Sequence, residues 1–383
     1  MTHRQIHRPT PHPRRVRPSA GQVFFCLMST FCFVLILRNS DAAIEYLGRG
    51  LTLCARAVIP SLFPFMVISE LLVSSGAGEA FGRLFARVMR WLFGLSGAGV
   101  SAVILGSMCG FPVGAKTAVS LLDRNMISKA ECEHLLTFTS NPSSAFLITA
   151  VGVSLFGNRR LGVILYAIVL GTSFLVGFLA RFFLRGKGKP NPHPHYPVGL
   201  HPGGVEMFTS AVSSAASNML IVCAYVVFFS AIMGALGCLF GDMGSRASGL
   251  PYTLLGGFLE LSSGISEASL LPNARMGMIL AAAFAGWSGL SVHCQVMTLC
   301  AGRGLSLKPY VIAKLFQGVL CAVCMAAVIA FCDPAWLTPA SDTVIEALMM
   351  MGWSLRDITV PALVTDSLFI GGWLISRVRG WQG

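Results

Sequence analysis

Charged residues are scarce in this chain. Asp, Glu, Lys and Arg make up 11% of its 383 residues, and 54% are hydrophobic, whereas soluble domains carry about 25% charged residues. Several apolar runs approach or exceed the roughly 20 residues that cross a bilayer. The composition therefore excludes a soluble domain and predicts a protein that crosses the membrane several times. The net charge of +12 then concerns loop orientation rather than nucleic acid, because basic residues collect in cytoplasmic loops.

The sequence also lacks the patterns of common enzymes and metal sites. It has no H-E-x-x-H, G-x-x-x-x-G-K-[ST] or G-x-G-x-x-G motif. Its 12 Cys lie mostly in apolar runs, where Cys behaves as a small hydrophobe, and they imply no disulfide framework. Residues 286–289 fit the G-x-S-G of rhomboid proteases, but that chemistry needs a His base on another helix. His293 follows Ser288 on the same segment, so we expect no enzyme, no metal and no cofactor.

Composition divides the chain into five parts. Residues 1–20 form a basic tail that we expect to be disordered, and residues 21–184 hold a first helix and a first repeat half. Residues 185–205, rich in Pro and Gly, form a cytoplasmic linker. Residues 206–332 hold the second half, and residues 333–383 an outer connector and a C-terminal helix. We expect an all-α membrane fold with about eight crossings.

Two stretches set 150 positions apart organise this fold. Residues 105–121 and 255–271 are apolar at their ends, match at five of 17 positions, and break in the middle, at 110–114 and at 261–264. A second broken segment follows each, at 139–144 and at 285–291. Paired interruptions at corresponding places in two halves indicate a transporter's binding site. The alternative is ordinary helices that tolerate Gly and Pro.

The basic residues predict how these stretches thread the membrane. If 98–121 and 250–271 are re-entrant hairpins and the N-terminus is inside, 18 Lys/Arg lie in cytoplasmic parts, 7 outside and 3 in the membrane. If both segments cross instead, the split falls to 15 and 10, against the positive-inside rule. We therefore predict hairpins, with loops 122–133 and 185–205 inside. Three crossings between the hairpins place them on opposite faces, so the halves are expected to be inverted repeats.

The breaks supply the candidate substrate site, because irregular backbone at membrane depth survives only where protein or a watery cavity satisfies it. Half-helix N-termini there attract anions. Trp287 offers a flat face to an aromatic ligand, although a packing role is equally open. We expect the breaks to meet at a cavity near the midplane, with Trp287 facing it. The candidate substrate-binding residues are Gly110, Phe111, Pro112, Gly114, Lys116, Asn141, Pro142, Ser143, Ser144, Ser262, Ser263, Gly264, Trp287, Ser288 and Gly289.

Charged and titratable residues near the breaks form a second group of candidates. Lys116 lies just beyond the first break, where an intramembrane cation is expensive and by default functional. Its alternative role is an ion pair with Glu260 or Glu267 of the other hairpin, and these carboxylates could also bind a coupling cation or proton. Glu70, on the second span, is a weaker candidate. His293 could report protonation, or be a buried, hydrogen-bonded His.

The motifs at these breaks resemble a known family. GSMCGFPVGAK at 106–116, TSNPSS at 139–144, GWSGLSVHCQV at 286–296 and IPSLFPF at 59–65 are similar to those of sporulation integral membrane proteins of YlbJ type. These belong to the nucleoside-recognition, or Gate, group, whose architecture is similar to concentrative nucleoside transporters. The resemblance covers roughly residues 40–330. It implies a role in spore formation and, for one such member, movement of dipicolinic acid, an aromatic dianion.

These observations together predict a transporter of a small anionic or aromatic metabolite in the cell membrane or a forespore membrane, with a cytoplasmic N-terminus. The expected partners are a small-molecule substrate and the lipid bilayer, without nucleic acid, and the oligomeric state is open. The alternative is a non-transporting membrane scaffold or nucleoside-sensing protein. A transporter needs a polar cavity at mid-membrane, whereas a scaffold can have a packed centre.

Overall fold

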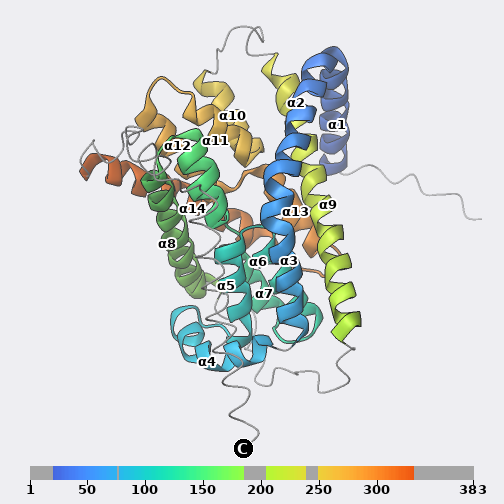
Figure 1. Ribbon diagram of the computed structural model, residues 1–383, viewed down its shortest axis with the longest axis vertical. Coiled ribbons are helices and arrows are strands. Elements are labelled where there is room, and N and C mark those ends of the chain that lie inside the picture. Colours follow the sequence, from blue (N-terminus) through green and yellow to red (C-terminus); the bar gives the residue numbers. More distant parts are fainter. Residues whose placement is uncertain (1–19, 76, 185–203, 239–248, 332–383) are drawn as a thin grey trace, which may run out of the picture.

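The computed structural model describes residues 20–75, 77–184, 204–238 and 249–331, and within these ranges all regular structure is helical (Figure 1). The first half contains α1 (Ala20–Arg38), α2 (Ser40–Leu53), the π-helical η1 (Cys54–Val58), α3 (Ile59–Ser74), α4 (Ala77–Leu92), the 3-10 turn η2 (Gly97–Gly99), α5 (Val100–Cys109), α6 (Val113–Asp123), α7 (Lys129–Thr139), the π-helical η3 (Phe146–Leu155) and α8 (Arg159–Leu184). The second half contains α9 (Gly204–Gly237), α10 (Leu250–Leu259), α11 (Leu261–Ser269), α12 (Ala274–Trp287), α13 (Gly289–Cys300) and α14 (Lys308–Phe331). The all-α fold class is confirmed.

Four helical stretches are long and apolar enough to cross a membrane: α8, α9, the α12–α13 pair and α14. The number rises to six if two bent pairs, Cys26–Arg38 with Ser40–Leu53 and Leu84–Leu92 with Gly97–Cys109, each count as one span. The expected eight crossings are therefore not confirmed within the described ranges. The basic tail, nearly all of the linker and the predicted last helix fall outside those ranges.

The chain from residue 20 to residue 74 forms bent and directly joined helices. α1 and α2 are bent by 99° at their junction, and α2, η1 and α3 then follow one another without a gap from residue 40 to residue 74. The wide π-helical turn of η1 directly precedes Pro60, which lies in the first turn of α3. Because a proline lacks the N–H of the regular helical bond, a widened turn lets the helix continue past it.

Both segments predicted to be re-entrant are helical hairpins. Three residues join α5 to α6, and one residue joins α10 to α11. Small residues let the two arms of each hairpin pack closely. A Cβ on Gly114 would lie 2.8 Å from the Cα of Gly106, and a Cβ on Gly264 would lie 2.1 Å from the Cα of Gly257. Gly114 and Gly264 occupy matching positions in the sequence repeat. The repeat therefore marks the point in each hairpin at which its two helices touch.

The two hairpins enter the protein from opposite ends of α8. The stretch before α5 lies at the end of α8, where Arg181 donates a hydrogen bond to the carbonyl oxygen of Trp91. The stretch after α11 lies at the start of α8, since a Cβ on Gly277 would lie 3.8 Å from the ring of Phe156. Figure 1 likewise shows α5 and α6 in the lower half of the molecule and α10 and α11 in the upper half. An exact inverted repeat remains a prediction.

Loop 122–133, which was predicted to be cytoplasmic, contacts the loop after α13, whose Arg303 and Lys308 belong to the basic residues that the same count places inside. Arg303 donates to both carboxylate oxygens of Asp123, through Nε at 2.7 Å and Nη2 at 2.8 Å. The backbone N–H of Ser306 donates to Glu133 at 2.6 Å. Since these contacts join the loop after α6 to the loop after α13, the two loops lie on one side of the membrane, as the distribution of basic residues requires.

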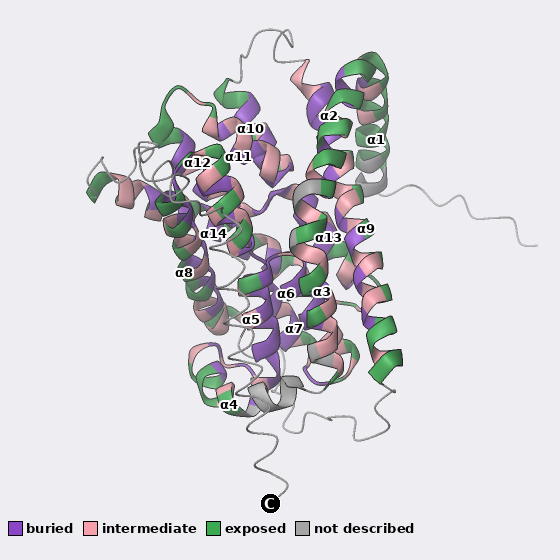
Figure 2. Ribbon diagram, viewed as in Figure 1, coloured by how far each residue is buried: buried purple, intermediate pink, exposed green. Residues whose placement is uncertain are grey.

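Burial separates an inner scaffold from an outer shell. Figure 2 shows buried residues concentrated along α5, α6 and α7, and exposed residues along the outer turns of α1 and α8. The outer faces carry large exposed apolar side chains, among them Phe31, Leu175, Leu220 and Val319. A soluble protein rarely exposes so much apolar surface. In a membrane protein such faces contact lipid, and the four breaks are left in the interior.

Candidate functional site: a cavity where the broken segments meet

A cavity of about 440 Å³ lies where both hairpin turns and both broken segments come together. The first half supplies Phe111 from its hairpin turn and Pro142 and Ser143 from its broken segment. The second half supplies Glu260, Leu261 and Ser262 from its hairpin and Ser291, Val292 and Gln295 from α13. Residues of α2, η1, α3 and α9, with those that follow the broken segment 139–144, complete a mostly apolar wall: Leu53, Val58, Pro60, Leu62, Ala145, Phe146, Thr149, Ala150, Val222 and Val226.

Each hairpin turn touches the break that follows it in the chain. Gly110 has φ +80°, and a Cβ there would lie 2.5 Å from the backbone nitrogen of Ser143. Gly289 has φ +75°, and a Cβ there would lie 2.8 Å from the backbone nitrogen of Leu261. Only glycine accepts both the positive φ and the close approach of another backbone. These two glycines therefore fix the turns against the breaks and leave the cavity between them.

The carboxylate of Glu260 caps the half-helix that points at the cavity. It accepts from the backbone N–H of Ser262 at 3.1 Å and of Ser263 at 2.7 Å, so it already neutralises the positive end of α11. Among the described residues that line the cavity, Glu260 is the one ionisable side chain. The cavity therefore offers an anion little positive potential on this side.

Two further polar atoms at the cavity lack partners. Ser291 Oγ and Gln295 Oε1 are buried, and neither has a hydrogen-bond partner within the described part of the chain. Buried polar groups are almost always hydrogen-bonded. Where no protein group is available as a partner, water or a ligand takes its place. Together with Glu260 they give the cavity a polar patch rich in acceptors, opposite walls that are largely apolar.

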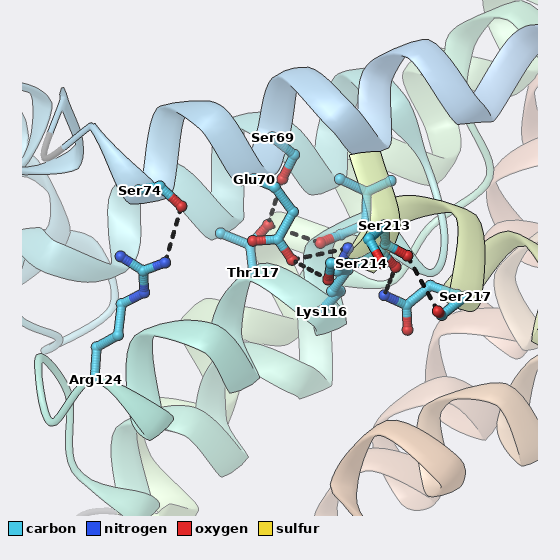
Figure 3. A network of polar contacts seen from close by, with 11 residues as sticks. Ser69, Glu70, Ser74, Lys116, Thr117, Arg124, Ser213, Ser214 and Ser217 are labelled. Carbon is cyan, nitrogen blue, oxygen red and sulfur yellow. Dashed lines mark hydrogen bonds and ion pairs between the residues drawn. The ribbon is translucent and has the colours of Figure 1, made fainter. Parts of the chain in front are cut away.

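Lys116 lies away from the cavity, in a polar network between α3, α6 and α9 (Figure 3). Its Nζ pairs with Oε1 of Glu70 at 2.8 Å, with side chains only 7% and 13% exposed. Ser214 Oγ on α9 donates to the same oxygen at 3.1 Å. The alternative role considered for Lys116, an ion pair with Glu260 or Glu267, is replaced by the pair with Glu70, because α3 rather than the second hairpin packs against this face of α6.

More contacts extend this network along α3 and α6. The hydroxyls of Ser69 and Thr117 lie 3.1 Å apart. Arg124, at the end of α6, donates to Ser74 Oγ at 3.0 Å. The arm of the first hairpin is therefore held to α3 along its length, which makes the Glu70–Lys116 pair part of the scaffold behind the cavity.

Trp287 packs against the second hairpin and is not among the residues that line the cavity. Its Nε1 donates to the carbonyl oxygen of Phe258 at 3.0 Å, and its ring stacks on that of Phe258 with centroids 5.5 Å apart. The ring centroid of His293 lies 4.2 Å from that of Trp287, and its Nδ1 is 2.8 Å from the carbonyl oxygen of Gly289. The expectation that Trp287 faces the cavity is corrected in favour of packing, and His293 is a buried, hydrogen-bonded His.

The other candidates support the breaks without lining the cavity. Ser288 has φ 76° and ends α12, and Asn141 donates to the carbonyl oxygen of Phe138 near the end of α7 at 2.8 Å. The remaining candidates that the structure does not bring to the cavity are Pro112, Gly114, Ser144, Ser263, Gly264 and Glu267.

Sequence reasoning missed Ser291 and Gln295 as site residues. With Ser288 they recur at intervals of three and four along the start of α13, which is the spacing of one helix face. That polar stripe in an apolar segment was the available signal. The walls from η1, α3 and α9 carried no such signal, because their residues are ordinary apolar ones.

Comparisons with known proteins agree with this description. Residues 55–239 match the Gate family model, which describes nucleoside recognition. The chain is 29% identical over 381 residues to the sporulation integral membrane protein YlbJ of Bacillus subtilis (strain 168), a match that covers 88% of this chain and 92% of that relative. No solved structure matches the chain. The resemblance expected from the sequence is confirmed, and the chain is a multi-pass membrane protein.

Proposed function

We propose that this multi-pass membrane protein, similar to YlbJ and carrying a Gate region, is a transporter that moves a small metabolite during spore formation. The observation that carries the proposal is the cavity of about 440 Å³ at which both hairpin turns and both broken segments meet. Transporters of repeated architecture bind substrate at such discontinuous helices. A protein that served only as a scaffold would have no need to keep a cavity with unpartnered polar groups there.

The lining supports a flat molecule that carries hydrogen-bond donors. Phe111 and Phe146 with aliphatic neighbours offer apolar walls, while Glu260, Ser291 and Gln295 offer acceptors. Ligand sites commonly combine apolar walls with a few placed polar groups, in volumes of about 300–1,000 Å³. We therefore expect an aromatic ring with N–H or O–H groups toward Glu260.

Dipicolinate, which the sequence resemblance implies, is compatible with the flat apolar walls. As a free dianion it would meet the carboxylate of Glu260, and two like charges at about 4 Å repel by roughly 4 kcal/mol at an effective dielectric constant near 20. The proposal therefore includes dipicolinate in a form neutralised by protons or by a chelated divalent cation. A nucleoside is the second candidate, because its hydroxyls are donors and residues 55–239 match a nucleoside-recognition model.

A binding screen tests this function. The purified full chain would be incubated with uridine, adenosine, dipicolinate, and dipicolinate with equimolar Ca²⁺, and ligand-induced stabilisation would be measured by thermal unfolding. We expect uncharged or neutralised ligands to stabilise the wild type, and Gln295→Leu to weaken the response by removing an acceptor. A matched control is Lys308→Gln, at the exposed start of α14, which should respond like wild type. If every ligand leaves wild type unstabilised, the scaffold alternative is favoured instead.

A further inference from the structure

Among the residues that the structure describes, Lys314 is the most deeply buried charged side chain, and it is not part of the cavity lining. It lies on α14 with 0% of its surface exposed. Its Nζ donates to Oδ1 of Asn141 at 3.1 Å and to Oε1 of Gln317 at 2.9 Å. Asn141 belongs to the broken segment 139–144 of the first half, so a lysine of the second half contacts the irregular backbone of the first half.

The acceptors around Lys314 are neutral amide oxygens. The ion pairs formed among the described residues leave Lys314 without a carboxylate partner. An ammonium removed from water without a counter-ion is normally unfavourable. A positive charge at this point therefore requires compensation from neighbouring dipoles.

The end of α7 supplies that negative potential. α7 stops at Thr139, two residues before Asn141, and the C-terminus of a helix carries a partial negative charge. The amide of Asn141 relays it, since Nδ2 donates to the carbonyl oxygen of Phe138 at 2.8 Å while Oδ1 accepts from Lys314. Gln317 closes the group by donating from Nε2 to the same Oδ1 at 3.0 Å and to the carbonyl oxygen of Val169 at 3.1 Å.

We propose that the ammonium of Lys314 is a built-in cation that holds the broken segment 139–144 in its irregular form, in the place where a protein without this lysine would bind a monovalent metal ion. In broken membrane helices, unwound backbone carbonyls and the C-terminal ends of half-helices coordinate Na⁺. Here two side-chain amide oxygens beside the C-terminal end of α7 offer a cation ligands of the same kind, neutral oxygens. A tethered ammonium meets the same oxygens without taking an ion from solution.

The position of Asn141 affects the cavity through the two residues that follow it. Pro142 and Ser143 line the cavity and follow Asn141 directly in the chain. Fixing Asn141 therefore fixes this part of the wall. The inference concerns how the break is held and does not depend on which solute, if any, the cavity transports.

Replacing the lysine and offering a free cation tests the proposal. Lys314→Ala removes the ammonium and leaves space, and the full-length variant would be purified in NaCl, in methylammonium chloride or in choline chloride of equal ionic strength. We expect its unfolding temperature in choline to fall by about 5 °C or more, and NaCl or methylammonium to recover at least half of that loss. Wild type and Lys308→Ala, a lysine exposed at the start of the same helix, should show no difference between the salts.

A second variant separates the charge from the packing. Lys314→Met keeps a chain of similar length without the cation, and hydrogen–deuterium exchange of residues 140–145 should speed up at least threefold while exchange in α8 stays the same. The proposal is overturned if Lys314→Ala unfolds at the wild-type temperature in choline, or if Na⁺ and methylammonium stabilise it no more than choline. Failure to obtain folded Lys314→Ala in all three salts, or unchanged exchange in Lys314→Met, also overturns it.

Discussion

The ion pair between Lys116 and Glu70 gives the sharpest energetic prediction. Nζ and Oε1 are 2.8 Å apart, and both side chains are almost completely buried. Lys116→Met would leave the carboxylate of Glu70 buried with the hydroxyl of Ser214 as the neighbour that donates to Oε1. Removing one member of a buried pair costs about 3–5 kcal/mol, because the other charge stays uncompensated.

The double variant separates the pair from the packing around it. Glu70→Gln removes the second charge and keeps the shape, so Lys116→Met with Glu70→Gln should recover at least about 2 kcal/mol relative to the sum of the single changes. Lys116→Met with Glu267→Gln should be additive to within about 0.5 kcal/mol, because Glu267 lies on the other hairpin. Transport by Lys116→Gln should fall because this variant is less stable. Transport should recover in Lys116→Met with Glu70→Gln.

Reversible unfolding in mixed detergent micelles, followed by circular dichroism of the helices, measures these free energies. Lys308→Met is the matched control, since it removes an exposed lysine and should change stability by less than about 0.5 kcal/mol. The reasoning fails if Lys116→Met is as harmless as this control. It fails equally if coupling is found with Glu267 rather than with Glu70.

Three further predictions concern the hairpins. Glu260→Ala should lower the free energy of unfolding by about 1–2 kcal/mol, as for other lost N-caps, and Glu260→Gln by less, both measured by denaturant unfolding. Gly264→Ala should destabilise the protein by several kcal/mol because the new Cβ meets the facing arm at 2.1 Å, whereas Gly171→Ala, with nothing within 4 Å, should be neutral; equal effects would refute the close packing. In labelling of intact cells with an impermeant thiol reagent, Asn273→Cys should react and Ser128→Cys should not, and the reverse pattern would invert the topology.

The sequence predicted the hairpins and breaks because Gly and Pro interrupt helices locally. Gly110 and Gly289 each act within their own turn, so the pattern identifies the place without knowledge of the rest of the fold. The opposite placement of the hairpins also followed from the sequence, since the distribution of basic residues constrains each loop separately.

Contacts between distant segments were not predictable in the same way. From the sequence, Glu260 and Glu267 were the ion-pair partners considered for Lys116, whereas the packing of α6 on α3 selects Glu70. Trp287 precedes a break, but the direction of its ring depends on Phe258 of the neighbouring hairpin. Such outcomes depend on tertiary packing, which a single sequence does not specify by spacing alone.

The central claim is that the cavity at the four breaks is the solute site, and blocking it in a transport assay tests that claim directly. Ala145 lines the cavity, so Ala145→Trp should fill it, whereas Val319→Trp places the same ring on an exposed face of α14. Uptake of radiolabelled uridine and of dipicolinate with equimolar Ca²⁺ would be measured in liposomes containing each full-length protein. The account predicts saturable uptake of at least one solute by wild type and Val319→Trp, and at least a tenfold loss in Ala145→Trp. Equal uptake by Ala145→Trp, or uptake of neither solute by wild type, would contradict it.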